Sequence, residues 1–292
     1  MANHPPLKIA LLTMLALVSF AANSVLCRLA LGAGTIDATS FTLVRMLAGI
    51  VVLWLLVAGS GQGGRVTGAG SWRGAVSLFA YAIAFSFAYL SLDTGTGALI
   101  LFGSVQLSML VATLFGGQRL HMVEWSGLGV AVGGFVYLML PGATAPSAFG
   151  FVLMVAAGIS WAVYTLSGQG SSAPLKDTYA NFVRTAPMLA PLLMIALMSG
   201  EYSLEGIMYA VLSGGLASGV GYALWYGALR GLTGLQAGVL QLLVPVIAAL
   251  GGVVFASEIL TERLVFASLL ILGGILAVVA GGGLLRRARR LS

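Results

Sequence analysis

Apolar residues run along this chain in long stretches, separated by short breaks. A membrane-spanning helix needs about 20 predominantly apolar residues, and ten stretches are about that long. The breaks between them carry turn residues or charges, as at 59–65 and 141–146. The pattern therefore predicts an all-α polytopic membrane protein. Its ten transmembrane helices are expected at residues 7–31, 39–58, 73–92, 97–116, 123–140, 149–168, 179–198, 207–229, 234–256 and 264–285.

Composition supports the same fold class. Of the 292 residues, 59% are hydrophobic and only 8% are charged, whereas soluble domains are about one quarter charged. A soluble enzyme is thereby excluded, and a single cysteine, Cys27, excludes a disulfide-bonded secreted scaffold. The first apolar stretch is longer than the core of a signal peptide, so we expect it to be retained as a helix.

The basic residues predict the orientation. With ten spans both ends lie on one side, and the loops on that side hold most of the lysines and arginines, which marks it as cytoplasmic. The tail at 286–292 is strongly basic, and we expect it to lie against anionic lipid rather than to bind nucleic acid. The ten basic residues on the cytoplasmic side are Lys8, Arg65, Arg73, Arg119, Lys176, Arg230, Arg286, Arg287, Arg289 and Arg290.

Short sequences recur in order along the two halves of the chain. Segments 19–21, 39–45, 89–97 and 133–134 match 160–162, 178–184, 226–234 and 273–274, at offsets between 137 and 141. Each copy holds five spans, an odd number, so the two copies must cross the membrane in opposite directions. We expect a first five-helix repeat at 1–140 and a second at 149–285. Inverted repeats of this kind place a binding site near the membrane centre and suit a transporter.

Several motifs resemble those of a known family. Val-Arg pairs open the second span of each copy, at Val44-Arg45 and Val183-Arg184, and the second copy has Pro245, the segment 257–261 (Ser-Glu-Ile-Leu-Thr) and Gly273-Gly274. The chain thus resembles the drug/metabolite transporter superfamily, and its EamA-type exporter branch in particular. The first copy departs from that pattern, with Ser108 in place of the proline and Gln118-Arg119-Leu120 in place of the glutamate motif.

The resemblance implies a carrier in the bacterial inner membrane that exports amino acids. Glycine placement and aromatic content are similar to those of the aromatic amino acid exporters of this superfamily. A broader metabolite or drug exporter of the same superfamily is the alternative.

None of the acidic residues is predicted to lie near the membrane centre. All eight lie in loops or within a turn of a predicted helix end, and so do both histidines. A proton-coupled pump or an exporter of lipophilic cations usually needs an acid inside the bilayer. We therefore expect a facilitative carrier of substrates that are neutral overall, such as zwitterionic amino acids. The acids are Asp37, Asp93, Glu124, Asp177, Glu201, Glu205, Glu258 and Glu262.

Neutral polar and aromatic side chains do occur inside the spans. Aromatic faces stack on apolar substrates, and amide groups can hold a carboxylate or an ammonium group without carrying charge. The alternatives are an interface belt for the aromatic residues and helix-bridging hydrogen bonds for the amides. The candidate binding residues are Ser19, Asn23, Tyr81, Tyr89, Gln106, Trp161, Tyr164, Tyr222, Trp225 and Gln241. No cofactor or metal ion is expected, and the oligomeric state is left open.

Three further positions have competing interpretations. Arg45 and Arg184 could bind a substrate carboxylate, but we expect them to snorkel, or to pair with Asp37 and Asp177 or with carbonyl groups at helix ends, as structural contacts. Pro245 breaks a backbone hydrogen bond one turn after Gln241, which predicts either a gating hinge or a static bend.

Enzyme motifs such as HExxH, GxSxG and the Walker A sequence do not occur in the chain. A membrane-embedded enzyme and a channel are therefore the minor alternatives to a carrier.

Overall fold

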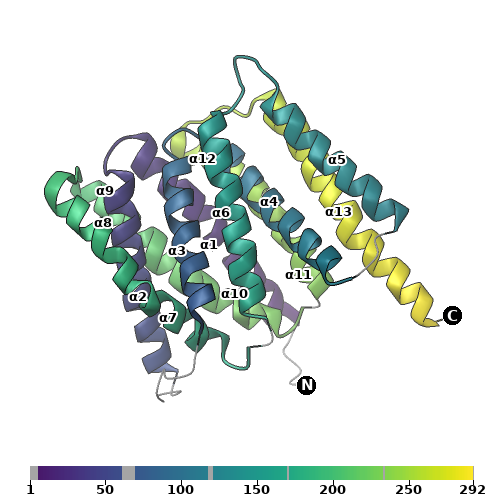
Figure 1. The fold of residues 1–292 in the computed structure, drawn as a ribbon, viewed down its shortest axis with the longest axis horizontal. Coiled ribbons are helices and arrows are strands. Elements are labelled where there is room, and N and C mark those ends of the chain that lie inside the picture. Colours follow the sequence, from purple (N-terminus) through teal and green to yellow (C-terminus); the bar gives the residue numbers. More distant parts are fainter. Residues whose placement is uncertain (1–5, 61–69, 118–120, 170, 233, 292) are drawn as a thin grey trace.

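A computed structural model describes residues 6–60, 70–117, 121–169, 171–232 and 234–291. These residues form helices joined by short connections (Figure 1). Their β pairing is limited to an isolated bridge between Ile36 and Tyr202. The helices are α1 (Pro6–Gly32), α2 (Ala38–Gly59), α3 (Trp72–Ala88), α4 (Thr94–Phe115), α5 (Met122–Met139), α6 (Ala148–Ser167), α7 (Pro174–Arg184), α8 (Ala186–Ser199), α9 (Leu204–Val211), η1 (Leu212–Val220), α10 (Gly221–Leu229), α11 (Gly234–Gln241), α12 (Leu243–Ala256) and α13 (Glu262–Leu291).

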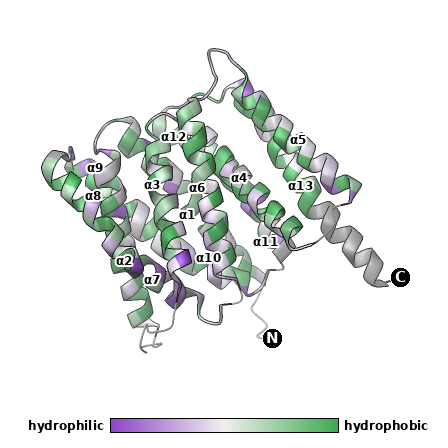
Figure 2. Ribbon diagram, in the orientation of Figure 1, coloured by the Kyte–Doolittle hydropathy of each residue, from purple (hydrophilic) through white to green (hydrophobic). Residues whose placement is uncertain are grey.

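Eight helical segments of the described chain are long and apolar enough to cross a membrane. The bent pair α7 and α8 would make a ninth, and α3, with 17 residues, is apolar but shorter. Large apolar side chains such as Phe115, Leu197 and Phe255 point outward, as lipid-facing residues do. Figure 2 shows hydrophobic residues along most helix faces, with hydrophilic ones gathered near α7 and the neighbouring helix ends. The chain is thus a multi-pass helical membrane protein.

The predicted span at 179–198 was wrong in one respect, because it is broken rather than continuous. Two helices, α7 and α8, meet there at a bend of 45° around Thr185. Pro187 lies in the first turn of α8 and has no backbone N–H to donate to Val183, so the α7 ladder ends there. The span also begins earlier than expected, at Pro174.

The stretch predicted at 207–229 is helical throughout but contains a π-helical segment, η1. Its glycines let it lie against α2, because a Cβ on Gly214 would fall 1.8 Å from the carbonyl oxygen of Arg45. Wide turns of this kind are frequent at functional sites. This one brings Ser213 toward α1 and α2.

The stretch predicted at 234–256 is interrupted at Leu242, between α11 and α12. Pro245 lies three residues further on and is buried. It cannot donate a hydrogen bond to the carbonyl of Gln241, one turn earlier. The break lies close to this proline, and its role as a gating hinge or a static bend stays a prediction.

Helix α1 lies at the centre of the fold and packs against η1, α10 and α12. Helices α3 and α4 both pack on α6. Helices α5 and α13 pack along each other at one edge, while α8 and α9 lie at the opposite edge (Figure 1). The side chains of the expected basic tail at 286–292 lie outside the described residues.

Candidate binding cavity

A cavity of about 470 Å³ lies among α4, α6, α7, α10 and α11, and we call it the main cavity. Its wall is mostly aromatic and apolar, with amide and hydroxyl groups between. Toward its mouth it is lined by Gln169, Ser171, Pro174 and Asp177, from the connection between α6 and α7. Asp177 accepts hydrogen bonds there from the backbone N–H of Gly70 and the hydroxyl of Ser171.

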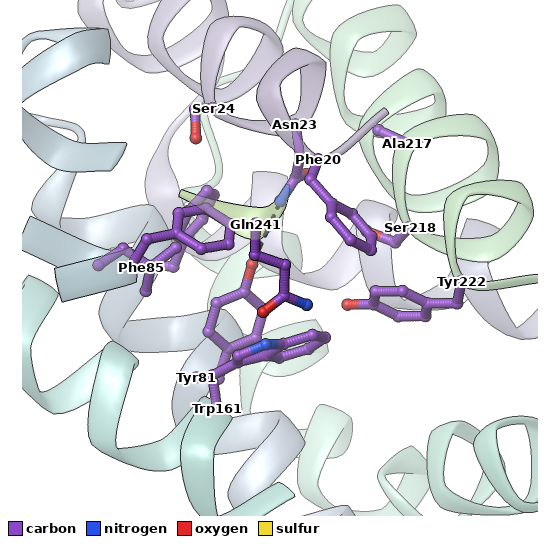
Figure 3. A pocket seen from close by; sticks show the side chains of 12 residues that line it. Phe20, Asn23, Ser24, Tyr81, Phe85, Trp161, Ala217, Ser218, Tyr222 and Gln241 are labelled. Atoms are coloured by element: carbon purple, nitrogen blue, oxygen red, sulfur yellow. Dashed lines mark hydrogen bonds between the residues drawn. The ribbon is translucent and has the colours of Figure 1, made fainter. Parts of the chain in front are cut away.

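A much smaller space, which we call the deep hollow, continues from the inner end of the main cavity. It has a volume of about 20 Å³, which is room for about one water molecule. Asn23, Ser24, Tyr81 and Phe85 line it (Figure 3). Four residues line both spaces and so form the boundary between them: Phe20, Trp161, Tyr222 and Gln241.

Trp161 on α6 is the centre of the aromatic wall. Its ring centroid lies 4.8 Å from that of Tyr81, 5.2 Å from Tyr164 and 5.3 Å from Tyr222. The rings are tilted rather than parallel, an arrangement favoured by aromatic quadrupoles. Phe20 from α1 adds contacts with Tyr222, at 6.0 Å. Helices from both halves of the chain thus build one aromatic surface.

Hydroxyl groups hold the cavity wall together further out. The Thr178 hydroxyl donates to the Tyr226 hydroxyl at 3.1 Å and accepts from Tyr164 at 3.4 Å. These contacts link α6, α7 and α10. The wall is therefore fixed by hydrogen bonds while its apolar faces remain available to a ligand.

Arg45 is buried behind the deep hollow, and the expectation that it pairs with Asp37 was wrong. Asp37 instead caps α2 by accepting from the backbone N–H groups of Thr39 and Ser40. The Arg45 side chain lies over Phe85 and Tyr81, with its guanidinium carbon 5.0 and 5.8 Å from the ring centroids. Its Nη2 donates to the Asn23 Oδ1 at 3.4 Å.

A charged cluster lies at the opposite end of the protein from the connection between α6 and α7. The Arg28 guanidinium on α1 lies 3.2 Å from Glu258 and 3.2 Å from Asp93. Glu258 also accepts from the backbone N–H of Thr94, the first residue of α4, at 2.9 and 3.0 Å. Together these residues, which we call the Arg28 cluster, join α1 to α4 and to the loop after α12. A separate hollow of about 270 Å³ lies beside the cluster, with Asp93 and Glu258 in its wall.

Most of the ten candidate binding residues lie around these two spaces. Tyr81 and Asn23 line the deep hollow, and the others that line the main cavity are Gln106, Trp161, Tyr164, Tyr222, Trp225 and Gln241.

Ser19 and Tyr89 line neither space. The Ser19 hydroxyl donates to Leu15 of its own helix. Tyr89 is fully buried near the Arg28 cluster, where its hydroxyl donates to the Thr94 carbonyl.

Phe20 was not among the candidate binding residues predicted from the sequence, and a structural role was favoured over a binding role for Arg45. Phe20 lies three residues before Asn23, so helical spacing puts both on one face of α1. The tryptophans interpreted as belt residues, Trp72 and Trp125, are 59% and 53% exposed. They face outward, away from the cavity.

Comparisons with known proteins agree with this architecture. The model of the EamA-like transporter family matches residues 148–280. Uncharacterized protein PA1977 of Pseudomonas aeruginosa is 47% identical over 278 residues, which cover 94% of this chain and 96% of that protein. A solved crystal structure resembles the fold with a TM-score of 0.62 at 22% identity, over 91% of this chain and 97% of the other. The chain belongs to the EamA-like transporter family.

Proposed function

We propose that this transporter is a carrier that exports amino acids with aromatic or other bulky apolar side chains by alternating access. The observation that carries the proposal is the main cavity, which is walled by aromatic rings and amides and ends at the protein centre. Its volume of about 470 Å³ falls in the range of roughly 300–1,000 Å³ typical of small-molecule sites. Trp161 and Tyr222 offer ring faces to an apolar side chain, and Gln106 and Gln241 offer neutral polar groups to a zwitterion.

Pairs of packed helices support an arrangement of two inverted five-helix repeats, 1–140 and 149–285. In this arrangement α1, α3 and α4 of the first repeat correspond to α6, α10 and α12 of the second. The contact of α3 with α6 then corresponds to that of α10 with α1, and the contact of α4 with α6 to that of α12 with α1. Counterparts also touch each other, as α5 does α13, α4 does α12 and α2 does α7. In this proposal α3 and the bent pair α7–α8 are spans, which gives ten. The family match at 148–280 nearly coincides with the second repeat.

Alternating access needs one end open and the other closed, and we infer that the two ends of this protein differ in this way. The main cavity reaches the connection between α6 and α7, while the Arg28 cluster joins three segments at the other end. Positive-inside asymmetry assigns the α6–α7 connection and both termini to the cytoplasm of a bacterial cell. This conformation would then be open to the cytoplasm. Reporter fusions to either terminus are expected to report a cytoplasmic location, and an external C-terminus would contradict the assignment.

The placement of acids supports flux down the substrate gradient without a proton site in the membrane. Each of the eight carboxylates lies in a loop or in the first turn or cap of a helix. Glu124, for example, is buried but accepts from the backbone of His121 at the start of α5. A lipophilic cation would find no carboxylate at the inner end of the main cavity, which disfavours the drug-exporter alternative.

Uptake by reconstituted proteoliposomes tests this function. A panel of the twenty amino acids is measured with and without an imposed pH gradient. We expect saturable uptake of phenylalanine, tryptophan, tyrosine and leucine, and stimulation by the gradient of less than about threefold, or about 0.65 kcal/mol of driving force. Non-saturable flux would indicate a channel, and selective uptake of lipophilic cations would indicate a drug exporter.

A further inference from the structure

A buried cation without a counter-ion lies next to the deep hollow. The Arg45 side chain is 3% exposed, and no carboxylate of the described residues lies within 4.0 Å of it. An unpaired charge removed from water is costly in any protein, and more so inside a membrane. The stacking on Phe85 and Tyr81 offsets part of that cost, but it does not neutralise the charge.

The hydrogen bonds of the Arg45 guanidinium are also incomplete. Nη2 donates to Asn23, but Nη1 has no hydrogen-bond partner among the described residues. The Asn23 amide is engaged on both sides, since its Oδ1 also accepts from Ser213 at 2.6 Å and its Nδ2 donates to the Tyr81 hydroxyl at 3.2 Å. The guanidinium thus carries a charge that no carboxylate of the described residues neutralises, and at least one of its N–H donors is unused.

Three residues whose side chains contact Arg45 also line the deep hollow: Asn23, Tyr81 and Phe85. Figure 3 shows these three side chains around the space, together with Trp161, Tyr222 and Gln241, which also line the main cavity. The hollow has room for about one water molecule, and so for one oxygen of a carboxylate, and Arg45 lies directly behind its wall. A ligand held in the main cavity can therefore present its head group, but not its ring, toward Arg45.

We propose that Arg45 is the anion subsite of this carrier and binds the carboxylate of the substrate from the deep hollow. The carboxylate supplies the missing counter-charge and accepts from the guanidinium, while the aromatic ring stays against Trp161 and Tyr222. The Tyr81 hydroxyl accepts from Asn23 and keeps its own hydrogen to donate. The inference rests on the proposed function and specifies which end of the substrate enters first.

Binding of three related ligands to the purified protein tests the subsite. L-phenylalanine carries both charged groups, 3-phenylpropionate has only the carboxylate and phenethylamine has only the ammonium group. Quenching of tryptophan fluorescence gives the affinities. We expect the wild type to bind both carboxylates at least about tenfold more tightly than phenethylamine, because charge-assisted hydrogen bonds to arginine are strong and tenfold corresponds to only about 1.4 kcal/mol.

The variants Arg45→Met and Arg45→Gln are expected to lose about tenfold or more in affinity for both carboxylates, and about twofold or less for phenethylamine. Because Met is apolar and removes the buried charge, Arg45→Met is also expected to melt no lower than the wild type. If either variant fails to fold, the other gives the same comparison. Arg73→Gln is the control, since Arg73 is an exposed arginine at the start of α3.

The outcomes separate this inference from the proposed function. A folded Arg45 variant that binds 3-phenylpropionate as tightly as the wild type overturns the subsite. So does a wild type that binds phenethylamine at least as tightly as the acids, although that result would leave an aromatic cavity in place. A wild type that binds none of the three ligands would overturn the aromatic cavity and the subsite together.

Discussion

At the scale of single side chains, Trp161 is the residue that we expect to contribute most to ligand binding in the main cavity. It contacts three other aromatic residues, from α3, α6 and α10, yet keeps part of its surface open to the cavity. Tryptophan gives a large contact area at a low cost in conformational entropy, because it has only two side-chain torsions. Its exposed face is therefore the most suitable surface for an aromatic substrate.

Replacing this ring should weaken transport in a graded way. Trp161→Leu and Tyr222→Ala are expected to lower the apparent affinity for phenylalanine by about two- to tenfold, because a stacked pair contributes about 0.5–1.5 kcal/mol beyond burial. Gln241→Ala is expected to do the same by removing an amide. Concentration-dependent uptake at equal protein amounts gives these values.

Trp125→Leu is the matched control, since Trp125 faces outward on α5. If Trp125→Leu is the most damaging of these variants and the other three transport normally, the cavity residues are only packing residues.

At this scale the sequence predicted which types of residue line the site better than it predicted which residues each side chain contacts. Mid-span amides and aromatics were expected at the site, and eight of the ten candidates line one of the two spaces. Pairing with Asp37 was one of the structural contacts expected for Arg45. The structure separates them, since Asp37 caps α2 while Arg45 points into the protein. The direction of a side chain depends on which helices cross there, and η1 crosses α2 at Gly214.

At the scale of elements, small residues set how closely helices approach. Helices α5 and α13 cross where Gly127 and Gly274 face each other. A Cβ on Gly274 would lie 2.5 Å from the Gly127 carbonyl oxygen and 2.6 Å from the Ala131 nitrogen. The neighbouring Gly273 has nothing within 4 Å of its would-be Cβ. Adjacent glycines of one helix thus have opposite roles.

Thermal melting of paired variants tests this contrast. Gly274→Val should force α5 and α13 apart and lower stability by about 1–3 kcal/mol, as overpacking usually does. Gly273→Val makes the same change in helix propensity but enters open space, so it should melt within a degree or two of the wild type, well under about 1 kcal/mol. Equal melting temperatures for the two variants would contradict the crossing described here.

The interruption between α11 and α12 is the element we propose to act as a hinge during gating. Pro245→Ala restores a donor to the Gln241 carbonyl and favours one continuous helix, so exchange of phenylalanine across the membrane should slow severalfold while its affinity changes little. Pro191→Ala, at an exposed proline inside α8, is the control. An unchanged exchange rate in Pro245→Ala would make the break a static bend.

Helix positions were largely predictable, because long apolar runs leave few alternatives in a membrane. Predicted and observed ends mostly agree within three residues, as for α1 and α6. The break at Thr185 could have been suspected from Pro187. The π-helical turn at Leu212–Val220 could not, because it depends on a close approach to α2 that no local pattern encodes.

At the scale of the whole molecule, the main cavity and the Arg28 cluster lie toward opposite ends of the protein, and in the proposed function one central pathway runs between them. Arg28 lies on α1 and Glu258 in the loop after α12, so their ion pair would tie together the two repeats that we propose. The Arg28 and Glu258 side chains are 24% and 12% exposed, which protects the contact from solvent screening. Separating the repeats at this end requires breaking it.

Weakening the cluster should shift the protein toward opening on the external side. Loss of about 1 kcal/mol, a typical upper value for a partly exposed ion pair, would raise the open fraction about fivefold. The probe is Ser24→Cys in a Cys27→Ala background, because Ser24 lies in the deep hollow, one turn of α1 before Arg28. Arg28→Gln should speed its labelling by an external, membrane-impermeant thiol reagent about fivefold, and Arg73→Gln should not. Equal labelling rates would show that the cluster does not close the pathway.

Counterflow tests the central claim, that this member of the EamA-like family is an alternating-access carrier of aromatic amino acids. Proteoliposomes are loaded with unlabelled phenylalanine and diluted into a trace of the labelled amino acid. A carrier that releases unlabelled phenylalanine outside binds a labelled molecule there and brings it in. The account therefore predicts that label accumulates transiently above its equilibrium level, and that this accumulation disappears when the liposomes are loaded with buffer alone. Label that only equilibrates, at the same rate in loaded and empty liposomes, would contradict the account.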